Sequence, residues 1–112
     1  MDKMRALNCY KNSTISENLM SYFAQCFIDP NKMTMLKQLR DQHLAYIKTV
    51  KDSIAYGGVC GTDEIPYQSI CLFLNVNTQS EVENFIANDP FNSVYSNIEI
   101  KPFVQRIPAV ES

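Results

Sequence analysis

The sequence predicts a single α+β domain whose elements follow the order β-α-β-β-α-β. Its 112 residues match the usual size of one domain, and a composition that is 46% hydrophobic and 20% charged supplies enough apolar material for one core. Strand-like and helix-like apolar spacings alternate along the chain. We expect a folded domain over residues 19–105. Residues 1–18 are predicted to be an N-terminal extension, ordered only where something holds it, and residues 106–112 a C-terminal tail.

The first predicted strand and helix lie in residues 20–51. Residues 20–29 carry aromatic and other β-forming residues on both faces, which is typical of a strand covered on both sides. The helix is expected over residues 33–51, where apolar positions recur at spacings of three and four. This stripe comprises Leu36, Leu39, His43, Ile47 and Val50. His43 should therefore point at or near the core, with Arg40 at the stripe's edge and Lys37 on the polar side.

Two strands are predicted in the middle of the chain. The first, from Ser53 to Cys60, is a short strand in which Ile54-Ala55-Tyr56 runs into Gly57-Gly58, and paired glycines at a strand end are typical of a bulge or a close backbone approach. Residues 67–77 are the strongest strand, with a wholly aliphatic face for the helices and a mixed opposite face.

A second helix and a last strand complete the predicted domain. The helix starts at Thr78 or Ser80, with Ser80-x-x-Glu83 as a capping box, and stops before Pro90. The last strand, residues 98–101, is expected to end at Pro102.

These elements predict a ferredoxin-like βαββαβ fold, a four-stranded antiparallel sheet with two helices on one face. The uncovered face carries Ser69, Cys71 and Phe73, and is too apolar to remain wet. We therefore expect a homodimer that associates through the open sheet face.

The composition argues against several classes of function. A net charge of −2 without any basic block makes nucleic acid a poor partner, and residues 67–77 lack the Lys and Arg of an RNA-binding sheet. The longest apolar run, residues 70–74, is too short to span a bilayer. No apolar segment typical of a secretory signal follows Lys3 and Arg5, so we expect a cytoplasmic protein.

The cysteines predict neither a disulfide framework nor a metal site. Four cysteines and one histidine are present, without a Cys-x-x-Cys pair, so no metal and no cofactor is expected. Cys71 has no charged sequence neighbour that would stabilise a thiolate, and it is expected to serve packing.

Four segments, in the right order, resemble the YCII family. They are Arg40-x-x-His43-Leu44, the pair Gly57-Gly58, Asn88-Asp89-Pro90-Phe91, and Ile98 to Phe103. The resemblance covers about residues 20 to 105. Members usually have proline directly after the strand-end glycine, where this chain has Val59.

The resemblance implies a dimeric α+β barrel with His43 and Asp89 together in an active-site cleft. Arg40, Gly57 and Gly58 would lie nearby and bind substrate. Most members have no known substrate, and one branch is a dehydrochlorinase that acts on a chlorinated hydroquinone.

The residues themselves leave structural and functional explanations open. A histidine on an apolar stripe is ordinarily a core residue, whereas one bonded to a carboxylate has a fixed tautomer and a free nitrogen that can act as a base. Asp89, before proline, commonly caps or turns the chain. Arg40 fits either a substrate carboxylate or phenolate, or a solvated surface position. The glycine pair is first a backbone requirement.

Two functions follow from these alternatives. The first is a cofactor-independent enzyme in which His43 and Asp89 transfer a proton on a small metabolite, a lyase, dehydrohalogenase or isomerase. The second is a non-catalytic dimeric domain that binds a small molecule in its cleft.

Overall fold

The computed structural model describes residues 20–107. The predicted N-terminal extension and residues 108–112 of the predicted tail lie outside the described residues. Four strands, two helices and three short 3-10 helices alternate along this part of the chain. In order they are β1 (Met20–Ile28), η1 (Pro30–Lys32), α3 (Met33–Thr49), η2 (Lys51–Ser53), β2 (Ile54–Cys60), β3 (Ser69–Leu74), α4 (Gln79–Ala87), η3 (Pro90–Val94) and β4 (Tyr95–Val104).

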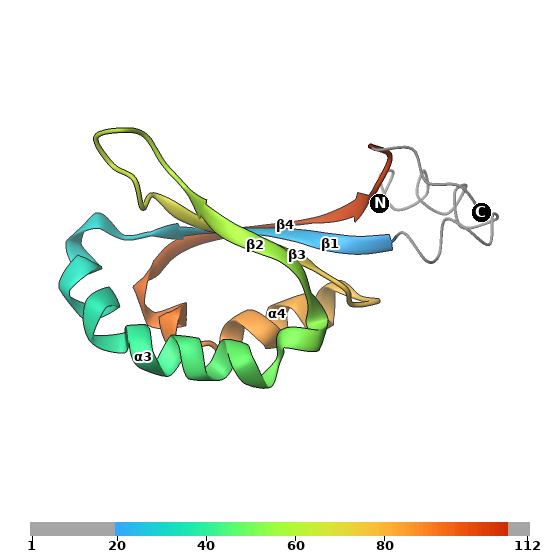
Figure 1. Cartoon of the computed structure of the whole chain (residues 1–112), viewed down its shortest axis with the longest axis horizontal. Helices are drawn as coiled ribbons and strands as arrows, with labels where there is room; N and C mark the ends of the chain where they lie inside the picture. Colours follow the sequence, from blue (N-terminus) through green and yellow to red (C-terminus); the bar gives the residue numbers. More distant parts are fainter. Residues whose placement is uncertain (1–19, 108–112) are drawn as a thin grey trace.

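The strands form one antiparallel sheet in the order β2-β3-β1-β4, and both helices cover the same face of it (Figure 1). The first and third strands are central, and the second and fourth are edges. This is the ferredoxin-like α+β arrangement, so the predicted fold class is confirmed. Among residues 20–107, no helix has both the length and the apolar character needed to cross a membrane.

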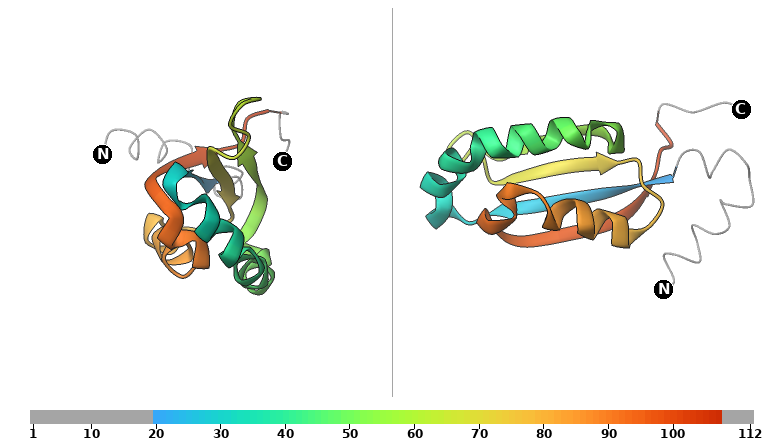
Figure 2. Two further views of the ribbon diagram at one scale, coloured as in Figure 1. Left: turned by 90° about the vertical axis from the view of Figure 1, so that its left-hand side faces the viewer. Right: turned by 90° about the horizontal axis from the view of Figure 1, so that it is seen from below.

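The two helices cover different halves of the sheet and pack differently. In the view from below, α4 runs beside β1 and β4, whereas α3 runs along the β3 side (Figure 2). The shorter helix, α4, buries Val82, Phe85 and Ile86, but no residue of the longer α3 is fully buried. The strands contribute alternate side chains to the core. These are Tyr22, Ala24, Cys26 and Ile28 from β1 and Ile70, Leu72 and Leu74 from β3.

The capping box of α4 lies two residues before the predicted one. Thr78 is the N-cap, with the Glu81 N–H donating to its Oγ1 at 3.2 Å, and the Thr78 N–H donating to Glu81 Oε1 at 3.0 Å. The predicted box at Ser80 and Glu83 is wrong. The reason is that β3 ends at Leu74, earlier than expected, so the helix also begins earlier.

The predicted end of β2 at Cys60 is confirmed, but the predicted place of the glycine pair at a strand end and the predicted end of the last strand are wrong. β2 continues through Gly57-Gly58 to Cys60, and a Cβ at Gly57 would lie 3.1 Å from Leu72 Cδ2, so the close approach occurs within the strand. Pro102 lies inside β4, opposite Tyr22. An edge strand tolerates proline because the missing N–H can be one that faces away from the sheet.

The open face of the sheet carries an aromatic cluster, which we define as Phe23, Tyr56, Phe73 and Phe103. The ring centroid of Phe73 lies 5.1 Å from Phe23, 6.0 Å from Tyr56 and 4.9 Å from Phe103. Tyr56 remains 72% exposed and Phe103 36% exposed. The open face is therefore apolar as predicted, because each of the four strands contributes one aromatic side chain to it.

Candidate active site

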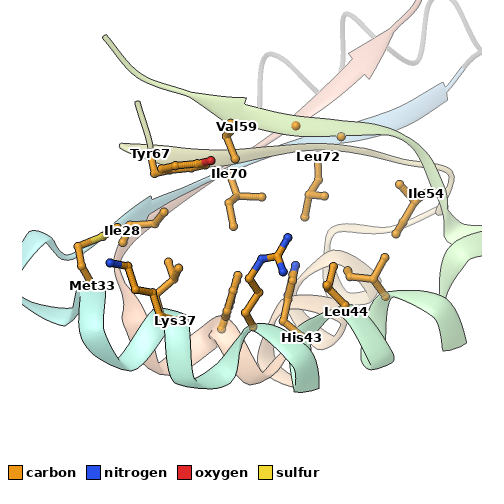
Figure 3. A pocket seen from close by; sticks show the side chains of 16 residues that line it. Ile28, Met33, Lys37, His43, Leu44, Ile54, Val59, Tyr67, Ile70 and Leu72 are labelled. Atoms are coloured by element: carbon orange, nitrogen blue, oxygen red, sulfur yellow. The ribbon is translucent and has the colours of Figure 1, made fainter. Parts of the chain in front are cut away.

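His43 and Asp89 lie in direct contact although they are 46 positions apart in the chain. His43 projects from α3 toward the sheet, and its Nδ1 is 2.7 Å from Asp89 Oδ1 (Figure 3). The His43 side chain is 13% exposed and that of Asp89 2%. A carboxylate only accepts hydrogen bonds, so Nδ1 carries a hydrogen and donates it. In the neutral ring this tautomer leaves the lone pair of Nε2 available to take up a proton.

Asp89 is held by the local fold that follows α4. It is the N-cap of η3, with extended backbone angles of φ −75° and ψ 129°, and its Oδ1 accepts the Phe91 N–H at 2.9 Å. Its own N–H donates to the Ile86 carbonyl at 3.1 Å. The capping role and the contact with His43 are therefore both present, because one oxygen accepts both hydrogen bonds.

Phe91 fixes the plane of the histidine ring. The two rings are stacked, with centroids 3.9 Å apart and planes 4° from parallel. Together, the stack and the bond to Asp89 restrict both the plane and the rotation of the imidazole. Phe91 stands in the segment Asn88-Asp89-Pro90-Phe91 that marks the family resemblance, but nothing in the sequence assigned it this role.

A cavity of about 620 Å³ lies between α3 and the sheet, and His43 forms part of its wall (Figure 3). The predicted binding residues Arg40, Gly57 and Gly58 also line it, whereas Asp89 does not and lies behind His43. Most of the wall is apolar, and this part was not predicted. It consists of Ile28, Met33, Leu36, Leu44, Ile47, Ile54, Val59, Ile70, Leu72 and Phe91.

The charged groups of the cavity wall are all cationic. Lys37 and Arg40 line it, and no acidic side chain does. Neither cation has an ion-pair partner among residues 20–107. Lys37 is exposed, as predicted for the polar side of the helix, and its side chain also lines the cavity (Figure 3). Tyr67 adds a hydroxyl from the sheet side, so the cavity combines an apolar body with a few polar groups of positive or neutral charge.

Three weak acids are close enough to Asp89 for its charge to raise their pKa values. Burial, and then the nearby Asp89 charge, raise the pKa of Cys26 to about 12. Burial and Asp89 likewise raise the pKa of Tyr46, and burial, Cys26 and Asp89 raise the pKa of Tyr95. All three therefore stay protonated and uncharged at neutral pH.

Within residues 20–107, no group of three or more His, Cys, Asp or Glu side chains could hold a metal ion. What the site offers chemically is an oriented imidazole at the edge of an apolar cavity with cations nearby.

The solved structures that are similar to the chain include the following three. The first is 5-chloro-2-hydroxyhydroquinone dehydrochlorinase (TftG) from Burkholderia phenoliruptrix AC1100 in complex with 2,5-dihydroxybenzoquinone, with a TM-score of 0.63 and 23% identity, covering 72% of this chain and 90% of that one. The protein Atu4242 from Agrobacterium tumefaciens has a TM-score of 0.52 and 10% identity, and the match covers 81% of this chain and 99% of that one. A putative antibiotic biosynthesis monooxygenase from Bacteroides thetaiotaomicron VPI-5482 has a TM-score of 0.51 and 14% identity, and the match covers 87% of this chain and 98% of that one.

At these identities the likeness concerns the fold. It places the chain in the class of ferredoxin-like α+β proteins that includes a dehydrochlorinase, a lyase-type enzyme. No family model and no curated protein matches the sequence.

Proposed function

We propose that the protein is a cofactor-independent enzyme in which His43, oriented by Asp89, removes a proton from carbon of a small metabolite. The reaction is of the lyase, dehydrohalogenase or isomerase type. The observation that carries the proposal is the bond of 2.7 Å between His43 Nδ1 and Asp89 Oδ1 at the wall of the cavity. A general base needs a free lone pair, a fixed direction and access to substrate. The Nδ1–H tautomer leaves the lone pair on Nε2 free. The hydrogen bond to Asp89 and the stack with Phe91 fix the direction of the ring, and the cavity gives a substrate access to it.

The cavity supports a ligand with an apolar, planar body and one acidic group. The apolar wall suits the body, and Lys37 and Arg40 suit a carboxylate or phenolate, because no acidic side chain competes for them at the wall. The cations would also stabilise negative charge that develops on the substrate when carbon loses its proton.

We further propose that the chain is a member of the YCII family and acts as a cytoplasmic homodimer, with the folded domain at residues 19–105. The homodimer forms a dimeric α+β barrel through the open sheet face. The aromatic cluster supports this arrangement, since Tyr56 and Phe103 are large exposed side chains on a face that neither helix covers. Sedimentation of Tyr56→Lys beside the wild type tests it, and a wild type that sediments as a monomer would contradict the dimer.

Proton removal from carbon is the first event in all three reaction types, so it is tested directly. The full chain is incubated in D₂O with small aromatic and acidic carbon acids, and exchange of each C–H for deuterium is followed by ¹H NMR. Chlorinated hydroquinones are included, with chloride release as a second measurement. We expect exchange or chloride release that depends on His43 and Asp89.

The informative variant is His43→Asn. Its side-chain NH₂ takes the position of Nδ1 and can still donate to Asp89, but the ring nitrogen that acts as base is gone. Loss of turnover with retained ligand binding supports the proposal. If ligands bind and neither exchange nor chloride release occurs in the wild type, the protein is the non-catalytic binding domain instead.

A further inference from the structure

Two cysteine sulfurs lie against each other on the open face of the sheet, away from the cavity. Cys60 ends β2 and Cys71 lies in β3, and their Sγ atoms are 3.2 Å apart. The strand register places Cys60 opposite Ser69 and Cys71 opposite Gly58, so the cysteines are diagonal neighbours on one face. Both are free thiols in this structure.

The surroundings of the two thiols differ. Cys60 is exposed, whereas Cys71 is half-buried and has Ser69 Oγ 3.9 Å from its sulfur. Burial and the contact with Cys60 raise the pKa of the Cys71 thiol. Cys60 is therefore the sulfur that a dissolved oxidant meets first, and Cys71 is the neighbour that can react with the product.

We propose that Cys60 and Cys71 form a reversible dithiol–disulfide site, oxidised by a peroxide and reduced by a small thiol. In the first step the Cys60 thiolate attacks hydrogen peroxide. An S–O bond forms, the O–O bond breaks, and hydroxide leaves as water after taking a proton. In the second step the Cys71 sulfur attacks the Cys60 sulfenic acid. The S–S bond forms, the S–O bond breaks, and a second water leaves with the Cys71 proton. The two thiols lose two electrons and two protons, and the peroxide becomes two waters.

The geometry favours this bond because the sulfur atoms must approach by only about 1 Å to reach disulfide length. The product would join the edge strand β2 to its neighbour at the end of the strand that supplies Gly57, Gly58 and Val59 to the cavity wall. Closing the hairpin covalently restricts the unfolded chain, so oxidation should raise the melting temperature by several degrees.

The test uses the full-length, tag-free chain, reduced, desalted and kept dilute, since the same face is the one proposed for the second copy. Hydrogen peroxide is added in small excess, remaining thiols are alkylated in denaturant, and intact mass and peptide maps are recorded. We expect one intrachain disulfide between Cys60 and Cys71, lost mass of two hydrogens, and full reversal by dithiothreitol. Cys26, which is 0% exposed, should remain alkylatable only after unfolding.

Single-cysteine variants show which of the two sulfurs reacts with the peroxide and which one then forms the disulfide. In Cys71→Ser the sulfenic acid of Cys60 should persist and react with dimedone, whereas Cys60→Ser should oxidise much more slowly. Cys9→Ser is the control and should give the same disulfide as the wild type. A disulfide to Cys9, a disulfide between two chains, or oxidation to sulfinic acid without any Cys60–Cys71 bond would each overturn the proposal.

Discussion

Replacing Asp89 separates its two roles, because one carboxylate oxygen both caps η3 and holds His43. In Asp89→Ala the loss of the cap costs about 1 kcal/mol, and the loss of a hydrogen bond to a charged group costs about 1.5–3 kcal/mol more. We therefore expect the free energy of unfolding to fall by about 2.5–4 kcal/mol. In Asp89→Asn the amide oxygen can accept from both His43 and Phe91, so the expected loss is about 1 kcal/mol.

The chain contains its own control. Asp29 also precedes a proline, and its Oδ1 accepts the Asn31 N–H at 2.9 Å, the same bond that Asp89 makes to Phe91. It has no histidine partner among the described residues. Asp29→Ala removes a cap alone and should cost about 1 kcal/mol.

Stability is measured by urea denaturation followed by far-UV circular dichroism, since the chain has no tryptophan. Proton transfer and the histidine tautomer, from ¹⁵N shifts of the ring, are measured on the same variants. Asp89→Asn should keep most of the stability and the Nδ1–H tautomer but lose most of the activity, because the charge that stabilises the imidazolium is gone. The reasoning is refuted if Asp89→Ala costs no more than Asp29→Ala, since the bond to His43 would then contribute nothing.

Three further predictions concern stability. The pKa of Cys26, raised from 9.0 to about 12, means that the stability from its protonated thiol is complete below pH 9 and is lost as pH rises toward 12. Cys26→Ala should therefore flatten the fall of stability across that range in alkaline urea denaturation, and an unchanged slope would exclude this thiol as its cause. A Cβ at Gly61 would lie 2.1 Å from the Ile65 carbonyl oxygen, whereas one at Gly58 would meet nothing within 4 Å. Gly61→Ala should cost more than about 2 kcal/mol and Gly58→Ala should change stability by less than about 1 kcal/mol, and equal urea midpoints would contradict this. The Tyr95 hydroxyl is buried without a hydrogen-bond partner among the described residues, so Tyr95→Phe should be neutral or stabilising by up to about 1 kcal/mol, and a clear loss of stability would show that the hydroxyl makes a contact of value.

The fold could be predicted because, in most of its elements, the spacing of apolar residues is typical of either a strand or a helix. The alternation of Ile70, Leu72 and Leu74 sets the buried face of β3, and the helical spacing around His43 sets the inner face of α3. Element ends were less well determined because neighbouring residues offer equivalent chemistry. Thr78 and Ser80 each have an acidic residue three positions later, and only the length of β3 selects the first.

The site could be predicted only in part. The sequence, through its family resemblance, brought His43 and Asp89 together, and it placed Arg40 and the glycine pair near them. The resemblance also implied a cleft, but the residues could not show which apolar side chains form its wall, because an apolar stripe looks the same whether protein side chains or an empty volume lie opposite it. Lys37 shows the same limit, since an exposed lysine directly after Leu36 of the stripe can also line a cavity whose extent the sequence does not show.

The cavity and the His43–Asp89 pair depend on each other through the way α3 is held. The nine-residue α4 fully buries three side chains, whereas the apolar side chains of the 17-residue α3 pack against the core but are only partly buried. Polar contacts attach it to the segments around α4. Tyr46 donates to the Phe85 carbonyl at 2.6 Å, and His43 donates to Asp89 at 2.7 Å. The bond that orients the His43 ring therefore also holds the helix that roofs the cavity. A variant that filled the cavity with larger side chains would bury α3 more fully and stabilise the protein, but it would occupy the space where the proposed substrate meets Nε2.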